Sequence, residues 1–387
     1  MNKPGYNHQP SSVVVFRTDA SLQVGSGHVM RCLTLATALR EQGAACHFLC
    51  REHSGHLIDM IEARDFTAHR LTMPRQTDCA ARESDGQPAH AHWLGTSWQA
   101  DAEACRPVLA HLAPDWLVVD HYALDARWEE AVLPESTRLM VIDDLADRPH
   151  RADLLLDQNL GRDVADYAHW VPANCQVLTG PHFALLRPEF AALRKVSLAR
   201  RHQHPPFKRL LISLGGVDKD NVTGQVLSAL RDCDLPPALD IEVVMGATAP
   251  WLDEVRHAAL TMPWPTNVVV NISDMAQRMA DADLAIGAAG STSWERCCLG
   301  LPTLMIVLAE NQRQVASALD NLGAAKLLGP VDVIAETLPS LLNKLGSSAL
   351  FEMSKTAATL VLGSGTEEVL AEMEQVDEAY LIGEIHL

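Results

Sequence analysis

The chain of 387 residues alternates short apolar runs with longer segments of helical apolar spacing, and it does so in two successive series. Short apolar runs of this kind predict strands that are buried on both faces. Strands that alternate with helices form parallel β-α-β units, so the pattern predicts an α/β fold. The predicted strands are 13–17, 45–50, 116–120, 139–143 and 154–157 in the first series, and 209–214, 241–245, 267–271, 284–288 and 303–307 in the second.

A basic, proline-containing stretch from Leu193 to Arg209 separates the two series. Its composition is typical of a solvated linker helix that runs into a connector, and a regulatory or binding role is the alternative. A chain of this length is expected to form two domains, since one domain usually has about 100–200 residues. We therefore expect an N-terminal α/β domain over 11–195, a C-terminal α/β domain over 206–363, and an acidic tail or helix over 364–387. The sequence assigns no role to this tail or to the histidine-containing segment 75–95.

The charge balance excludes several classes of partner. The chain has 31 Lys and Arg against 49 Asp and Glu, a formal net charge of −18. Such a surface repels nucleic acid and anionic lipid, so any phosphate group must be held locally. We find no apolar segment of the roughly 18 residues that a membrane helix needs. The polar start of the sequence lacks the apolar core of a signal peptide, which predicts a cytoplasmic location.

Two sets of residues could in principle bind a metal. Nine cysteines, an odd number, are typical of reduced and buried thiols rather than of a disulfide framework. Cys46, His47, Cys50, His53 and His56 lie close together in the sequence, but a strand over 45–50 sends neighbouring side chains to opposite faces, whereas zinc needs convergent ligands. The pair Asp143-Asp144 could hold Mg²⁺ against a diphosphate. We expect this pair to cap a strand end or to organise the site, and we expect no metal and no cofactor.

The first of three glycine-containing turns follows the first predicted strand. Arg17-Thr18-Asp19 ends that strand, and Gly25-Ser26-Gly27-His28 comes next, with Arg31 shortly after. Glycines let a ligand approach the backbone closely, and a histidine at a helix start is well placed to act on a substrate. A dinucleotide-binding motif would need its glycines tight against the strand, with a third glycine near Arg31, so that interpretation does not fit.

The other two turns lie in the second series. Gly215 and Gly216 follow the strand predicted at 209–214, with Asp218 close behind. The third turn contains Gly290, then Ser291 and Thr292 as candidate N-caps of a helix. Free amides and hydroxyls there could cradle an anion. Glu295 in the first helical turn could accept hydrogen bonds from two ribose hydroxyls, and simple complementation of the helix dipole is its alternative role.

Together these motifs resemble known families. The glycine-rich second half resembles the nucleotide-sugar-binding domain of the B-type glycosyltransferases, such as the lipid II-forming N-acetylglucosaminyltransferase of peptidoglycan synthesis. The turn at 17–31, Asp120-His121-Tyr122, the segment 141–148 and Asp157-Gln158-Asn159 resemble the UDP-sugar hydrolases of pseudaminic acid biosynthesis, which release UDP from UDP-2,4-diacetamido-2,4,6-trideoxy-β-L-altropyranose. The likeness extends from about residue 13 to about residue 328. It implies two Rossmann-like, doubly wound domains that face a cleft, the glycosyltransferase B-type fold.

The resemblance also implies a reaction, the metal-independent hydrolysis of a UDP-linked diacetamido sugar at its anomeric carbon. It places the catalytic histidine at His28, whose neutral imidazole suits a base at neutral pH. The expected substrate-binding residues are Arg17, Asp19, Gly27, Arg31, Tyr122, Asn311 and Gln312. The expected UDP-binding residues are Gly215, Gly216, Asp218, Ile272, Met275, Gly290, Ser291, Thr292 and Glu295.

Purely structural roles stay open for several of these residues. Tyr122 could be a half-buried packing residue, Asn311 a loop residue, and Arg17 with Asp19 an ion pair that serves only structure. Two other functions also stay open, namely a glycosyltransferase that passes the sugar to an acceptor and a non-catalytic UDP-sugar-binding module. The expected partner is a UDP-sugar, with no nucleic acid and no membrane. The sequence does not define the oligomeric state, and a monomer is the default expectation.

Overall fold

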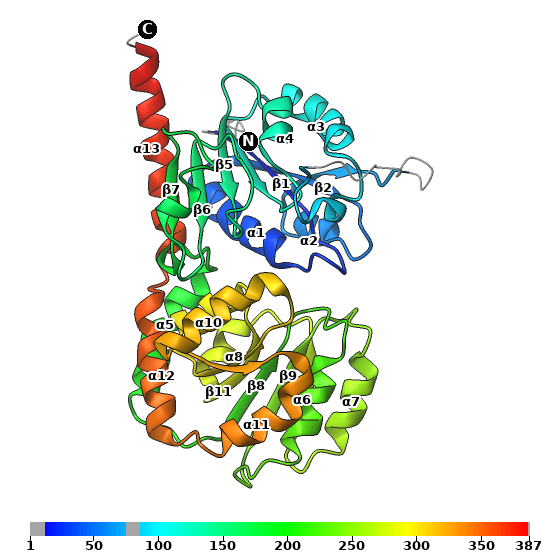
Figure 1. Cartoon of the computed structure of the whole chain (residues 1–387), viewed down its shortest axis with the longest axis vertical. Helices are drawn as coiled ribbons and strands as arrows, with labels where there is room; N and C mark the ends of the chain where they lie inside the picture. Colours follow the sequence, from blue (N-terminus) through cyan, green and yellow to red (C-terminus); the bar gives the residue numbers. More distant parts are fainter. Residues whose placement is uncertain (1–11, 75–85, 386–387) are drawn as a thin grey trace, which may run out of the picture. The chain divides into compact units, whose positions relative to one another are not determined.

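The computed structural model describes residues 12–74 and 86–385, with side chains described as far as Tyr380. The chain forms two compact units, each a sheet of strands with interleaved helices (Figure 1). The first unit contains the residues up to Asp157, then Asp163–Leu178 and the chain from Glu367. The second contains Gln158–Arg162 and Thr179–Thr366. The predicted α/β fold with two halves is confirmed.

The first unit has a seven-stranded sheet in the order β3-β2-β1-β4-β5-β6-β7. The pairings from β3 through β6 are parallel. The order reverses between β1 and β4, and open parallel sheets bind ligands at the carboxyl ends of the strands at such a point. The strands are β1 (Val13–Thr18), β2 (Ala45–Arg51), β3 (Thr67–Leu71), β4 (Trp116–Asp120), β5 (Arg138–Ile142), β6 (Leu154–Asp157) and β7 (Gln176–Thr179).

Alternating side chains of these strands build two apolar layers. Val15, Val119 and Val141 point to one face and pack in a core that includes Trp128 of α4. On β1 and β2, Phe16 stacks on Phe48, with ring centroids 4.9 Å apart. Both faces are therefore buried, as near-continuous apolar strands require. The helices of this unit are α1 (Gly27–Glu41), α2 (Ile58–Glu62), α3 (Trp98–Leu112), α4 (Ala126–Val132) and α13 (Gly365–Ile385), which starts at the boundary of the units.

The acidic C-terminal segment is a helix that packs on the first unit. Val369 and Met373 of α13 are buried. The carboxylate of Asp377 accepts a hydrogen bond of 2.9 Å from the indole Nε1 of Trp116 and forms an ion pair with Arg138. The segment that sequence alone left without a role thus returns the chain from the second unit to the first.

The second unit has a six-stranded parallel sheet in the order β10-β9-β8-β11-β12-β13, which reverses between β8 and β11. Its strands are β8 (Arg209–Ser213), β9 (Asp240–Met245), β10 (Thr266–Val270), β11 (Leu284–Ala288), β12 (Thr303–Ile306) and β13 (Lys326–Gly329). One apolar core lies against α6 (Val222–Leu230), α7 (Leu252–Leu260) and α11 (Ile334–Leu342). The other lies against α5 (Pro188–Arg201), α8 (Met275–Asp281), α9 (Thr292–Cys298), α10 (Arg313–Leu322) and α12 (Ser347–Leu360).

The expected solvated linker helix is wrong, because α5 is a packed helix of the second unit. Arg201 is 5% exposed. Its guanidinium donates hydrogen bonds of 2.9 Å to the carbonyls of Met279, Ala282 and Leu299, near the ends of α8 and α9. The last carbonyls of a helix lack partners within it, so a basic side chain can satisfy them. The basic residues of this stretch therefore indicate helix capping, and the boundary expected at 195–206 falls inside the second unit.

The packing of α13 gives a stability prediction. Replacing Met373 by Ala removes buried apolar volume, and we expect it to lower the free energy of unfolding by about 2–4 kcal/mol. The exposed neighbour Glu374 is the matched control, and Glu374→Ala should change that free energy by less than about 0.5 kcal/mol. Urea denaturation followed by circular dichroism measures both. Equal effects of the two substitutions would mean that α13 does not stabilise the first unit.

Candidate functional site

His28 and Asp120 form a dyad at the carboxyl ends of β1 and β4. His28 lies in the first turn of α1, and Asp120 is the last residue of β4. The Nδ1 atom of His28 lies 2.5 Å from Oδ1 of Asp120. An ionised carboxylate can only accept, so Nδ1 carries the hydrogen and donates it, which leaves Nε2 as the basic nitrogen. This is the tautomer that a general base needs.

Arg31 fixes the carboxylate of Asp120 from the next turn of α1. Its Nε and Nη2 donate to the two carboxylate oxygens over 2.6 and 2.7 Å, and Nη2 also lies 2.8 Å from Asp144. Burial by itself would raise the pKa of Asp120. The charges of Arg31 and His28 outweigh burial and hold that pKa well below its ordinary value. Asp120 is therefore ionised under the dyad.

Tyr122 forms one wall beside His28. The edge of its ring meets the imidazole of His28, with centroids 4.6 Å apart, and its hydroxyl donates to Asp144 over 2.5 Å. Burial and the charge of Asp144 raise the pKa of Tyr122 well above its ordinary value, so the phenol keeps its proton. Tyr122 is 4% exposed, so it is more buried than the half-buried packing residue that the sequence left open as an alternative.

Two aromatic residues of this wall were missed from the sequence. His90 and Trp93, beside and within the 3₁₀ turn Ala91–Leu94, lie against Tyr122 with ring centroids 5.5 and 5.7 Å away. Both are half-buried. Both lie in the histidine-containing segment 75–95. No strand or helix pattern in the sequence indicated that this segment lies near Tyr122. Its residues 75–85 lie outside the described residues.

Arg17 and Asp19 lie deeper, in a buried ion network. Arg17 is fully buried and Asp19 is 1% exposed. The guanidinium of Arg17 contacts Asp19 at 2.7 Å and Asp101 at 2.8 Å. The other oxygen of Asp19 lies 3.2 Å from Nε2 of His121. These contacts favour the structural ion pair over direct sugar binding. Gly27, which begins α1, is half-buried next to His28.

The two candidate metal sets hold other partners. Asp143 accepts hydrogen bonds from the amides of Leu145 and Ala146 and from Arg148, so it organises the turn after β5. Asp144 accepts from Arg31 and Tyr122. Cys46 is buried, and burial raises the pKa of its thiol to about 12. In the described parts of the chain, no group of three or more His, Cys, Asp or Glu side chains could hold a metal ion.

The second unit places the predicted glycines at the end of β8. Gly215 has a φ of +96°, which favours glycine, and a Cβ atom added at Gly215 or Gly216 would meet nothing within 4 Å. The backbone there borders open space. Asp218 uses both carboxylate oxygens on the amides of Val222 and Thr223, at 2.8 and 2.9 Å, and so caps α6. Both carboxylate oxygens of Asp218 thus already accept hydrogen bonds from α6, and its contact with UDP stays a prediction.

The third turn follows β11. Ser291 is exposed, and Thr292 and Glu295 are half-buried. Burial raises the pKa of Glu295, while Arg187, 3.6 Å away, opposes the shift. Gln312 lies beside this turn, since its Nε2 is 3.8 Å from the position of a Cβ on Gly290.

The remaining predicted residues lie in loops of the same unit. Asn311 is exposed in the 3₁₀ turn Glu310–Gln312 that follows β12. Ile272 and Met275 are half-buried where the loop after β10 leads into α8, and they pack against the apolar core of α8 and α9. The structure thus gathers Gly290, Ser291, Thr292 and Gln312 at one turn.

Comparisons with known proteins agree with this architecture. Residues 241–370 match the family described as the glycosyltransferase family 28 C-terminal domain. The crystal structure of MurG from Acinetobacter baumannii aligns with 94% of this chain and 99% of its own, with a TM-score of 0.66 and 16% sequence identity. The fold is that of the B-type glycosyltransferases. This confirms the predicted fold class.

Two relatives extend the comparison to the first unit. The UDP-2,4-diacetamido-2,4,6-trideoxy-beta-L-altropyranose hydrolase of Campylobacter jejuni is 24% identical over 80% of this chain and 97% of its own length. An uncharacterized protein of Methanocaldococcus jannaschii is 24% identical over 77% of this chain, which spans only 56% of that protein. The resemblance to the hydrolase family is confirmed. No helix in the described ranges has the length and apolar character of a membrane span.

The buried carboxylates predict how stability depends on pH. Asp120 and Asp101 have pKa values below the ordinary value in the folded state, despite burial, because of Arg31 and Arg17. A lowered folded pKa contributes stability above the unfolded pKa, and that stability is lost as the pH falls. We expect the free energy of unfolding to drop as the pH is lowered from about 5 to about 3.

Urea denaturation at each pH measures this slope. Asp120→Asn removes one of the titrating groups and should make the slope shallower. Asp253→Asn is the control, because the Asp253 side chain is 93% exposed, and its slope should match that of the parent protein. A slope unchanged by Asp120→Asn would contradict an ionised Asp120 in the folded state.

Proposed function

We propose that this protein hydrolyses a UDP-linked 2,4-diacetamido-2,4,6-trideoxy sugar and releases UDP. The observation that carries the proposal is the His28–Asp120 dyad, because a nucleotide-binding module would not need an oriented base in its first unit. The 24% identity to the Campylobacter jejuni hydrolase, over nearly all of that protein, supports the same reaction class. The match of the second unit to a glycosyltransferase family 28 domain supports a nucleotide-sugar ligand.

In the proposed reaction, His28 Nε2 takes a proton from water. The water oxygen forms a bond to the anomeric carbon, and the bond between that carbon and the phosphate oxygen of UDP breaks. Asp120 holds the imidazole in the required tautomer and stabilises the imidazolium that forms, as a carboxylate does for a catalytic histidine. Arg31 keeps Asp120 ionised and oriented. Tyr122 is proposed to line the sugar pocket as a neutral phenol.

In the second unit, we propose that UDP binds at the loops after β8 and β11. Gly215 and Gly216 would allow the diphosphate to approach the backbone, and the hydroxyls of Ser291 and Thr292 would donate to it. Glu295 would accept from the ribose hydroxyls, and backbone groups near Ile272 and Met275 would meet the uracil. Asn311 and Gln312 are proposed beside the sugar. Asp218 would act by shaping the glycine turn, since its carboxylate caps α6.

Replacing His28 tests the base directly. His28→Gln should lower kcat by roughly 10²–10⁴-fold and leave UDP binding measurable by calorimetry, because only proton transfer is lost. His150→Gln is the matched control. His150 is also a buried histidine of the first unit, 2.7 Å from the carboxylate of Glu129, and lies outside the proposed machinery. Its substitution should cost stability and spare kcat. Retained turnover in His28→Gln would remove His28 from the base role.

Isotope labelling tests the bond that breaks. In ¹⁸O-water, hydrolysis at the anomeric carbon places the label in the released sugar, measured by mass spectrometry. Label in UDP would mean attack at phosphorus and would contradict the proposed mechanism. The same assay, run over a panel of UDP-diacetamido sugars, identifies the substrate.

The second candidate is a glycosyltransferase, which the family 28 match and the MurG fold favour. The two functions differ in what they require, because a transferase holds its sugar until an acceptor arrives. Release of free sugar with no acceptor present supports the hydrolase. UDP release only after an acceptor is added would support the transferase instead, and UDP binding without any turnover would support the non-catalytic module.

A further inference from the structure

Arg296 is a buried cation at the turn after β11. It lies on α9 and is 2% exposed. Its Nη2 donates to the carbonyl of Ala288 over 2.6 Å and to the hydroxyl of Ser293 over 3.0 Å, and its Nη1 donates to the hydroxyl of Thr292 over 3.2 Å. The guanidinium thus connects the end of β11 to the start of α9 from beneath the turn 288–293.

Among the described residues this cation forms no ion pair, and the charge of the adjacent Glu295 offsets its burial only in part. Within the part of the chain that the structure describes, no carboxylate lies within ion-pair distance of Arg296, and its buried Nε has no hydrogen-bond partner. The neighbouring Glu295 lies 3.6 Å from Arg187 instead. Burial lowers the pKa of Arg296 to about 10, so the group is still charged at neutral pH. A buried charge without a counter-ion is costly, which calls for an anion from elsewhere.

The strand leaves room for this guanidinium. A Cβ atom at Gly287 would lie 2.4 Å from Nη1 of Arg296, so any side chain there would displace the guanidinium from its present position. Gly287 is fully enclosed in β11, between β8 and β12. The glycine therefore allows Arg296 to lie against the backbone at the carboxyl end of the strand.

The hydrogen bonds of Arg296 also set the direction of the Thr292 hydroxyl. A hydroxyl has one hydrogen to donate and two lone pairs to accept with. Since Oγ1 of Thr292 accepts from Arg296, its own hydrogen is available for a further acceptor. A cationic donor polarises the hydroxyl and makes it a stronger donor in its turn. Thr292 is half-buried, so part of its surface is open to a ligand.

We propose that Arg296 is the resident counter-charge for the diphosphate of the bound nucleotide. It acts through the turn, by its charge and by polarising the Thr292 hydroxyl, and it selects for ligands that carry phosphate. This inference rests on the proposed binding of UDP in the second unit. Arg296 is here a positioning residue, since its side chain is enclosed by the turn.

The test compares three ligands that differ in charge, namely uridine, UMP and UDP, by titration calorimetry. Arg296→Met should weaken UDP binding by roughly 10- to 100-fold, UMP binding by less, and uridine binding by less than about threefold. Arg296→Lys keeps the charge and should retain most of the preference for UDP over uridine. This variant also serves if Arg296→Met does not fold.

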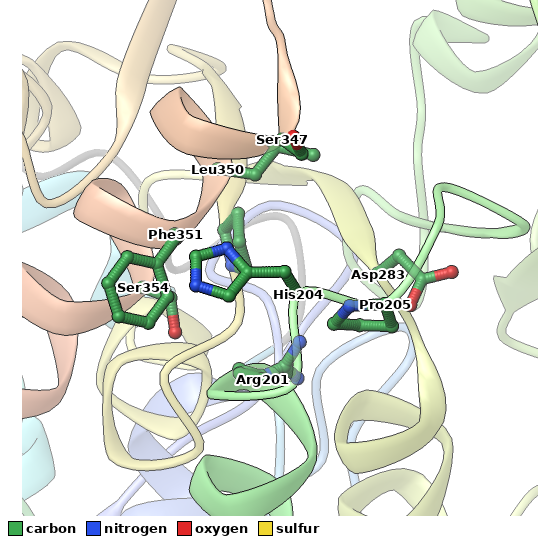
Figure 2. Close-up of a pocket in the computed structure, with 9 residues that line it drawn as sticks. Arg201, His204, Pro205, Asp283, Ser347, Leu350, Phe351 and Ser354 are labelled. Carbon is green, nitrogen blue, oxygen red and sulfur yellow. The ribbon is translucent and has the colours of Figure 1, made fainter.

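Arg201 provides the matched control. It too is a buried arginine of the second unit, its guanidinium bonds only to carbonyls, and burial lowers its pKa to about 9. It lies at the other end of β11, beside a small pocket lined by His204, Asp283 and Phe351 (Figure 2). Arg201→Met should lower the melting temperature and leave the ratio of UDP to uridine affinity unchanged.

The outcomes distinguish a role of Arg296 in binding phosphate from a role in shaping the turn. An equal loss for all three ligands in Arg296→Met, or a loss of preference in Arg296→Lys as large as in Arg296→Met, would mean that Arg296 only shapes the turn. No loss for UDP would also overturn the inference. Failure of the proposed UDP binding, on which this inference rests, looks different, because then the unsubstituted protein would bind neither UDP nor UMP.

Discussion

The carboxylate of Asp120 is the group on which the geometry of the candidate site in the first unit depends. It is fully buried, and both of its oxygens are used, one by Arg31 and the thiol of Cys32 and the other by Arg31 and His28. Removing an ion from water is costly, and the bidentate contact with Arg31 offsets that cost. Because Arg31 keeps the carboxylate ionised, the same group can orient an imidazole only 2.5 Å away. Stability and the tautomer of His28 thus come from one arrangement.

The topology of the sheet explains why these groups meet. Thr18 at the end of β1 is in register with Asp120 at the end of β4, although about a hundred residues separate them. The chain places β2 and β3 on one side of β1 and then returns to place β4 on the other side. The connections after β1 and β4 therefore lead away from each other, and the ends of these two strands are where open parallel sheets bind ligands. The second unit has the same reversal between the adjacent strands β8 and β11. The turn with Gly215 and Gly216 follows β8, and the turn 288–293 follows β11.

The sequence predicted ten strands and missed β3, β7 and β13. All three lie at sheet edges, where one side of the strand is open and less apolar character is needed. Their residues show this, with His69 and Arg70 in β3, Gln176 in β7 and Lys326 in β13. The edge strand β10 was found because it contains a run of three valines. Apolar runs therefore predict central strands well and edge strands poorly.

The site was predictable only in its local parts. The glycine turns and His28 stand out because the backbone geometry and the chemistry lie within a few neighbouring residues. The partners of these groups depend on contacts between distant segments, so sequence could not show that Asp120 orients His28 or that Trp93 lies against Tyr122. For Arg17 the sequence left two roles open, sugar binding and a structural ion pair, and its ion pairs with Asp19 and Asp101 favour the second.

The net charge of −18 limits how the second unit could bind an anionic ligand. A diphosphate approaching such a surface meets repulsion, and exposed lysines would be screened by salt and paired with the many carboxylates. A buried cation that forms no ion pair is screened less by salt, so it would attract a diphosphate at this turn more strongly than an exposed lysine would. The expectation of uncharged amides and hydroxyls is compatible with this arrangement, because those groups would make the contacts while Arg296 supplies the charge. Under the proposed binding of UDP, one buried arginine that forms no ion pair among the described residues would supply the positive charge that the acidic surface lacks.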